Sequence, residues 1–326
     1  MSSIRAASLA ALSIIVASAF APNAFAHCFV GARFFAATLT VDDPCVADEL
    51  SLPTVTAFGT GDDPSASQVN LSTELSKRIT DTLGVSIGST LSKITPPGME
   101  TVSGFQNLET TVKWQFLTLP QQEFVISMGL GIEWGGTGAQ AVGAETFSTY
   151  TPLLWFGKGF GDLPDSLAWM RPFAITGQVG YAFPGIAAAT TVDPDSGDVN
   201  VEYRAQVLRW GGTLQYSIPY LKSNVVDLGL PDVFDRLNFI VEAALQTPVA
   251  YTLTTGTLTT GTISPGLIWT EDYFQVGVEA LIPINRQSGS GVGVIAQVHI
   301  YLDDLFPKTI GKPLFGNSTS RRVMGN

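Results

Sequence analysis

The 326-residue chain is poor in charge and in long apolar runs, and each shortage excludes a class of protein. Charged residues make up 14% of the chain, below the roughly 25% that is typical of soluble domains. Basic residues number 17 against 28 acidic ones, so the formal net charge is −11 and we expect no nucleic-acid partner. Beyond the N-terminus no stretch reaches the ~20 apolar residues of a membrane helix, which excludes helical spanning. The glycine-rich stretch 135–138 lacks a following Lys-Ser or Lys-Thr pair, which excludes a phosphate loop there.

The first 26 residues have the features of a cleaved secretory signal peptide. Arg5 supplies a positive charge, 9–21 is apolar, and 24–26 reads Ala-Phe-Ala, a small-x-small cleavage site. We therefore expect an exported protein whose mature chain begins at His27.

Cysteine and histidine are scarce, and the few that occur lie close to this predicted terminus. The only cysteines, Cys28 and Cys45, are candidates for one disulfide in an oxidising compartment, with free thiols and a metal site as alternatives. His27 as a free N-terminus could chelate copper through its amine and ring beside Cys28. An incidental histidine is the other interpretation, and we predict neither a metal ion nor a cofactor.

Hydrophobic residues are spread through the chain in alternation, most regularly in the hairpin 273–302. Every even-numbered residue from 274 to 284 and from 292 to 302 is apolar, and none is charged. The opposite face carries polar groups such as Gln275, Glu279 and His299. A period of two predicts strands, and long strands with an uncharged face and a polar face are typical of a membrane barrel.

The same pattern recurs along the chain and predicts about 12 strands in all. Before the last hairpin, the expected strands are 50–58, 67–79, 83–91, 106–116, 123–134, 150–160, 173–183, 201–216, 237–245 and 261–270. The alternation slips near 208–209, which predicts a β-bulge. In lipid an unpaired strand edge is costly, so the first strand must pair with the last. A soluble β-sandwich or a lipocalin-like barrel is the alternative.

We therefore predict an all-β fold, a transmembrane antiparallel up-and-down β-barrel over 50–302 in the bacterial outer membrane. Residues 27–49 precede it as a periplasmic segment or a plug, and 303–326 follow as a periplasmic tail. Inward positions carry charges of both signs. These side chains either line a solute path or pair with one another across the lumen and fill it. The candidates to line the lumen are Glu74, Arg78, Glu109, Lys113, Glu133, Gln178, Arg204, Glu242, Gln275, Glu279, Gln297 and His299.

One pair of these residues suggests chemistry. If the last hairpin pairs Glu279 with Gln297, then Glu279 and His299 are diagonal neighbours. Such a pair could be the acid and base of a lumenal hydrolase. No serine motif accompanies the pair, so a hydrogen-bond network is the favoured interpretation and we expect no enzymatic activity.

Four stretches carry a resemblance to a known family. They are 31–55 (GARFFAATLTVDDPCVADELSLPTV), 103–109 (SGFQNLE), 156–184 (FGKGFGDLPDSLAWMRPFAITGQVGYAFP) and 291–307 (GVGVIAQVHIYLDDLFP). With these the chain resembles the proteobacterial outer-membrane barrels grouped as transporters of the meta-pathway of phenol degradation. The resemblance implies uptake of a small, often aromatic or hydrophobic molecule, and it implies no catalytic residues. One departure is that many barrels end on an aromatic residue, whereas 303–326 continue here.

The expected partners are outer-membrane lipids, the barrel-assembly machinery and a small-molecule solute, with the oligomeric state left open. Two alternatives to a channel remain. One is the lumenal hydrolase, and the other is a structural or assembly protein that docks a periplasmic partner through 27–49.

Overall fold

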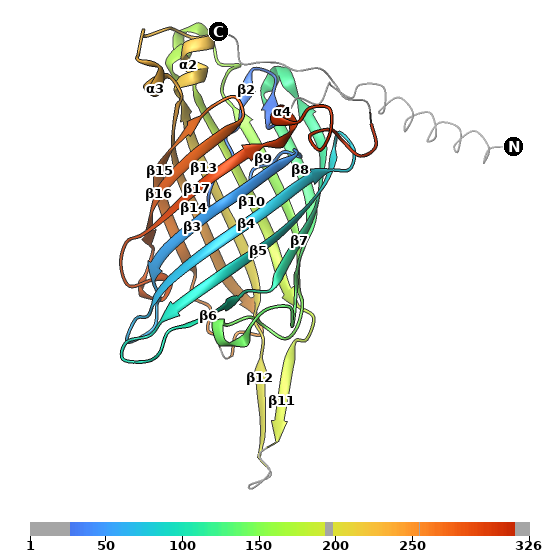
Figure 1. Ribbon diagram of the computed structural model, residues 1–326, viewed down its shortest axis with the longest axis vertical. Coiled ribbons are helices and arrows are strands. Elements are labelled where there is room, and N and C mark those ends of the chain that lie inside the picture. The colour runs from blue at the N-terminus through green and yellow to red at the C-terminus, as the bar shows by residue number, and fades with distance from the viewer. Residues whose placement is uncertain (1–26, 193–197, 254, 317–326) are drawn as a thin grey trace, which may run out of the picture.

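The computed structural model describes residues 27–192, 198–253 and 255–316, and twelve of its strands close into an antiparallel barrel (Figure 1). These strands are β3 (Glu49–Gly59), β4 (Ser67–Arg78), β5 (Leu83–Thr95), β7 (Leu108–Leu119), β8 (Phe124–Trp134), β9 (Thr149–Gly159), β10 (Phe173–Pro184), β13 (Gln206–Ser217), β14 (Leu237–Ala250), β15 (Thr260–Thr270), β16 (Phe274–Pro283) and β17 (Gly293–Tyr301). Each pairs with its neighbours along the chain, and β17 pairs with β3 to close the sheet. The predicted fold class is confirmed.

The outer face of the barrel is apolar and the inner face is polar. On β16, Val276 and Val278 are 40% and 42% exposed, whereas their neighbours Gln275 and Glu279 are 0% and 2% exposed. A soluble protein has the opposite arrangement, because water covers its polar side chains and its apolar ones form the core. Aromatic side chains such as Trp114 and Trp210 also lie on the outside. This pattern is the one that a hydrocarbon environment requires of a barrel.

The connections divide between two ends of the barrel. At the end where the described chain begins and ends, here called the terminal end, they carry η1 (Pro120–Gln122), η3 (Asp165–Met170), α2 (Ile218–Asn224) and α3 (Asp232–Asp235). At the far end they carry β6 (Val102–Phe105), η2 (Gln140–Val142), β11 (Ala188–Val192), β12 (Val199–Tyr203) and η4 (Arg286–Ser288). Figure 1 shows the β11–β12 hairpin extending beyond the barrel wall. Within the described ranges, no helix is long and apolar enough to cross a membrane.

The prediction of one continuous strand over 201–216 is wrong. Strand β12 ends at Tyr203, β13 begins at Gln206, and the register against β14 shifts between Gln206 and Val207 rather than at 208–209. The physical reason is a change of partner. Strand β12 pairs with β11 outside the barrel, whereas β13 pairs with β10 and β14 in its wall. The alternation of apolar residues continues unbroken from 201 to 207, across the junction between the two pairings.

Residues 27–48, here called the N-terminal segment, enter the barrel from the terminal end. The short strands β1 (Phe29–Val30) and β2 (Arg33–Phe34) pair across a turn at Gly31. Gly31 has φ +66°, and a Cβ there would lie 2.1 Å from the carbonyl oxygen of Pro120. Only glycine fits this turn, because a side chain would meet both the unfavourable φ and the η1 backbone.

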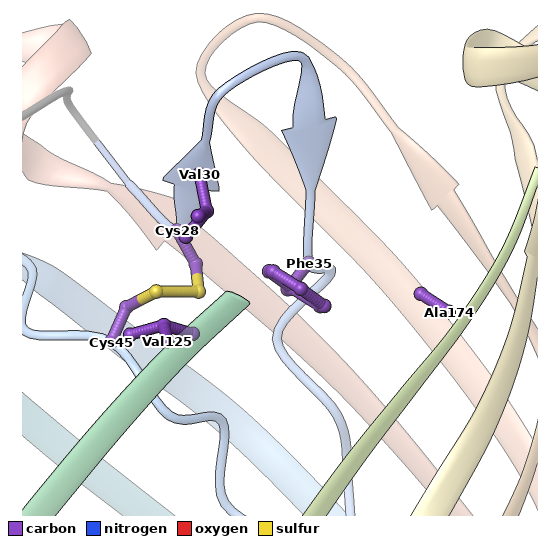
Figure 2. Packing of buried hydrophobic residues seen from close by; sticks show 6 residues of the cluster. All are labelled: Cys28, Val30, Phe35, Cys45, Val125 and Ala174. Atoms are coloured by element: carbon purple, nitrogen blue, oxygen red, sulfur yellow. A yellow bond between two sulfur atoms is a disulfide. The ribbon is translucent and has the colours of Figure 1, made fainter. Parts of the chain in front are cut away.

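A disulfide between Cys28 and Cys45 holds the N-terminal segment as a loop. Figure 2 shows the disulfide next to Val125 of β8, in a buried cluster that extends through Phe35 towards Ala174 of β10. A second buried cluster joins Phe34 and Ala36 of the segment to Ile240, Ile268 and Tyr301 of the wall. Both buried clusters therefore lie where the segment meets the inner wall.

The chain beyond β17 folds back over the terminal end. After α4 (Leu302–Leu305) it runs beside the β4–β5 turn, where Leu314 N donates to Arg78 O (3.1 Å) and Phe315 N donates to Ile79 O (2.8 Å). The Arg78 guanidinium donates to Gly311 O (3.1 Å). These bonds keep the described part of the tail against the rim.

Candidate functional site in the lumen

A cavity of about 510 Å³ lies in the lumen between the N-terminal segment and the barrel wall. The segment contributes residues 37–43 and 45–47 to its lining, and β3, β4, β5, β7, β8 and β17 contribute most of the wall. Among the predicted lumen residues, those lining it are Glu74, Glu109, Lys113, Glu133, Gln178, Gln297 and His299. Cavities of this size accommodate small ligands.

The cavity is rich in carboxylates. Its lining holds six of them (Asp42, Asp43, Glu49, Glu74, Glu109 and Glu133) against three fixed cations (Lys77, Lys113 and Arg209). Two of these cations are already paired, Lys77 with Asp48 and Lys113 with Asp42. The remaining excess of negative charge, enclosed by a low-dielectric wall, concentrates cations in the cavity.

Glu109 and Glu133 show this excess most clearly, because they are direct cross-strand partners on β7 and β8. Like charges that face one another across a sheet repel. Asn107 Nδ2 donates to Glu133 Oε1 (3.2 Å), which offsets part of that cost. Arg209 of the cavity lining also acts on Glu109, and a cationic group between the two carboxylates would offset the repulsion that remains.

The N-terminal segment is bonded to the wall through its backbone. Glu242 on β14 is 0% exposed and accepts hydrogen bonds from the N–H groups of Leu39 (2.9 Å), Thr40 (2.8 Å) and Val41 (2.7 Å). The Thr40 hydroxyl also donates to it. One carboxylate therefore satisfies three consecutive buried N–H groups, and hydrogen bonds to a charged acceptor are the stronger kind.

Other predicted lumen residues bind the segment or support its binding site and do not line the cavity. Gln275 donates to Ala37 O and accepts a hydrogen bond from the Tyr301 hydroxyl (2.8 Å). Glu279 lies beside Glu242, close enough for a hydrogen bond between the two carboxyl groups. Arg78 binds Asp48 at the terminal end, with Nε 2.7 Å from Oδ2.

Arg204 is not a lumen residue, which corrects the prediction. It lies between β12 and β13, and its guanidinium stacks 3.8 Å from the ring centroid of Phe147. The error has the same cause as the misplaced bulge. The alternation of 201–207 was read as barrel wall, whereas its first part belongs to the β11–β12 hairpin.

The register that would make Glu279 and His299 diagonal neighbours, on which the acid–base alternative rested, is also wrong. Strand β16 pairs with β17 so that Glu279 lies opposite Ile295 and His299 lies opposite Gln275. This register differs by two residues from the expected one, which keeps every side chain on its face but exchanges its partners. His299 instead contacts Ser51 Oγ through Nδ1 (2.8 Å) and Glu49 through Nε2 (3.3 Å).

Arg33 was missed by the sequence analysis. It is 1% exposed, with Nε 3.2 Å from Glu123 Oε2 and its guanidinium 3.6 Å from the ring centroid of Tyr220. Tyr220 in turn donates its hydroxyl to Glu123 Oε1 (2.7 Å). An arginine within the apolar stretch 29–37 was the available signal, because a buried cation needs a buried partner.

Two groups of side chains in the described ranges could in principle hold a metal ion. In the first, Cys28 and Cys45 with Asp43, both sulfurs are used by the disulfide. The copper hypothesis with Cys28 as a ligand is therefore wrong. The second group is His27, Asp303 and Asp304 at the terminal end.

Acidity should favour the docked position of the N-terminal segment. Burial raises the pKa of Asp43 to about 7, against the opposing effect of Lys113. When the segment leaves the lumen, the carboxyl returns to its ordinary pKa of 3.8. The docked state thus binds the proton more tightly, so docking is strongest at low pH and weakens as pH rises towards 7.

We expect hydrogen exchange of 35–48 to be roughly 10- to 100-fold faster at pH 8 than at pH 5, after correction for intrinsic exchange. Mass spectrometry on the protein in detergent measures this rate. In Asp43→Asn the pH dependence should shrink, since the amide can still accept from Cys45 N–H (2.8 Å). An unchanged pH profile in that variant would contradict this account.

The chain forms a closed twelve-stranded barrel with an apolar outside, a polar lumen and an internal segment. No family model and no curated protein matches the chain. Solved structures similar to it include the NanC porin, with 12% identity, a TM-score of 0.45, and coverage of 77% of this chain and 98% of that one.

The KdgM porin in complex with disordered oligogalacturonate shares 11% identity at a TM-score of 0.40, covering 76% and 98%. LpxR from Salmonella typhimurium shares 13% at 0.40, covering 78% and 99%. Such low scores carry no argument about function, and the resemblance to phenol-pathway transporters stays a prediction.

Proposed function

We propose that this protein is a channel of the bacterial outer membrane that admits a small cationic or zwitterionic solute, with its N-terminal segment as a plug. The observation that carries this proposal is the inside-out distribution of side chains. The outer face is apolar, while the inner face surrounds a polar cavity of about 510 Å³. The predicted signal peptide fits the same assignment, as does the position of both ends of the described chain at one end of the barrel, which the proposal places in the periplasm.

The cavity lining supports a polar solute over the aromatic or hydrophobic one that the family resemblance implies. Serine, threonine and charged residues make up most of the lining, and Trp155 is its only aromatic ring apart from His299 among the described residues. Trp155 is itself 1% exposed and lies under the ammonium group of Lys113 (4.7 Å). An apolar solute would therefore find little surface to bind.

The N-terminal segment is a plug in this proposal because it occupies the lumen and is bonded to the wall. Its apolar side chains, including Val30 and Phe35, are buried against the wall. They are not available to dock a periplasmic protein, so the geometry does not favour the assembly-partner alternative.

Liposome swelling tests the channel assignment. Proteoliposomes of the mature protein should swell faster in a small cationic amino-acid solution than in an anionic one of equal size, by about tenfold. Glu109→Gln combined with Glu133→Gln should remove much of this preference without reducing the neutral-solute rate. Gln68→Ala, near the far end of β4, serves as a matched control away from the cavity lining. Equal rates for all solutes, or none above empty liposomes even with the plug-release variant Glu242→Ala, would overturn the proposal.

A further inference from the structure

A cluster of metal-ligating groups lies where the beginning and end of the described chain meet. His27 begins the N-terminal segment, and Asp303 and Asp304 lie on α4. One donor atom from each residue lies within 4.8 Å of the other two. His27 Nδ1 is 2.6 Å from Asp304 Oδ2 and 3.4 Å from Asp303 Oδ1. The three groups thus converge on one point.

The surrounding residues hold the imidazole in this orientation. Its ring stacks on Tyr301 with centroids 4.3 Å apart, and Phe34 lies edge-on at 5.8 Å. The backbone N–H of His27 donates to Asp303 Oδ2 (2.7 Å). His27 and Asp303 are only 6% and 3% exposed. The ligands are therefore preorganised, which lowers the cost of binding an ion.

The charge balance of the cluster also favours a cation. Two carboxylates face a single imidazole, and burying such an excess is costly unless a positive charge compensates it. The nearby Arg78 has Nη2 3.8 Å from Asp303 Oδ2, while its Nε binds Asp48. A metal ion would take the place of the imidazole proton and bring a second positive charge between the two carboxylates.

We propose that His27, Asp303 and Asp304 form a binding site for a divalent transition-metal ion, with copper(II) bound most tightly. Imidazole and carboxylate ligands suit copper and zinc, and copper(II) leads the first-row affinity order. The three side chains suffice for the site. Cleavage after Ala26, as in the proposed function, would add the freed α-amine of His27 as a fourth, chelating donor.

The bound ion fastens the plug to α4. It joins the first residue of the N-terminal segment to the helix that follows the last strand. This link is independent of the Glu242 hydrogen bonds within the lumen. Ion binding should therefore stabilise the docked segment in proportion to the logarithm of free metal concentration.

Copper(II) titration of the purified, chelator-stripped full-length mature protein in detergent tests the site. We expect one equivalent to bind, with nitrogen hyperfine structure in the electron paramagnetic resonance spectrum. His27→Gln should weaken binding by at least about 100-fold and remove the imidazole contribution to the nitrogen hyperfine structure, and Asp304→Asn should weaken binding by at least about tenfold. Zinc(II) should compete for the same equivalent with lower affinity.

His299→Gln is the matched control, because it removes the only other histidine of the mature sequence and lies on β17 rather than at the cluster. Its affinity for copper(II) should equal that of the unmodified protein. Heat-modifiable gel mobility verifies that each variant forms the barrel. If His27→Gln does not fold, the Asp304→Asn result decides. The proposal is overturned if His27→Gln and Asp304→Asn bind copper(II) as tightly as the control does. It is also overturned if the unmodified protein shows no saturable binding. These outcomes leave the swelling test of the channel unaffected.

Discussion

Replacing Glu242 by alanine is expected to release the plug. The substitution deprives three consecutive buried N–H groups, those of Leu39, Thr40 and Val41, of their acceptor. Each lost bond to a charged group is worth about 1.5–3 kcal/mol, so docking should weaken by at least about 3 kcal/mol. The released fraction should then rise by about 100-fold or more. Single-channel recording in planar bilayers measures it as a rise in open probability.

Glu279→Gln is the matched control for that experiment. Glu279 lies beside Glu242 on β16, is as deeply buried, and makes no hydrogen bond to the N-terminal segment among the described residues. Its amide replacement has the same shape and removes no bond to the segment, so the open probability should not rise. If the Glu242→Ala channel stays as closed as the control, Glu242 does not hold the plug.

Removing the disulfide is expected to have the second-largest effect. Cys28 and Cys45 close a loop with a sequence separation of 17, and a cross-link of that length contributes about 3 kcal/mol by restricting the released chain. The Cys28→Ser, Cys45→Ser double variant also loses the buried contacts of the disulfide with Phe35 and Val125 (Figure 2). The segment should therefore leave the lumen far more often while the barrel stays intact.

Trypsin cleavage after Arg33 measures this release. Arg33 is 1% exposed in the docked segment, so the protease reaches it only when the segment has left the lumen. Cleavage after Arg33 should be about 100-fold faster in the double variant, with unchanged heat-modifiable mobility of the barrel. A reductant should accelerate cleavage of the unmodified protein and leave the double variant unchanged. Equal cleavage rates in both proteins would show that the disulfide does not retain the plug.

Most of the strands and the facing of their side chains could be predicted from sequence. Alternation is a local property, since each side chain leaves the strand on the side opposite to its neighbour. That is why residues such as Val278 on the outside and Glu279 on the inside were assigned to the correct face. The prediction failed at 201–207, where the chain changes from one strand pairing to another without any change in its local pattern.

The site could be predicted only as a set of inward residues. Whether Glu74 or Glu242 borders open space depends on where the N-terminal segment lies. Likewise, a shift of two residues in the pairing of β16 with β17 preserves the alternation of both strands. The sequence pattern therefore could not show that His299 and Glu279 are not neighbours.

What the amino-acid pattern determines in this protein is therefore a set of two-faced strands with a polar and an apolar side. Which polar groups meet was decided by the closed barrel, because such contacts join residues far apart along the chain. Leu39 and Glu242 are separated by 203 positions, and His27 and Asp303 by 276. No periodicity encodes such distances, since they arise only when β17 pairs with β3 and the segment fills the space enclosed.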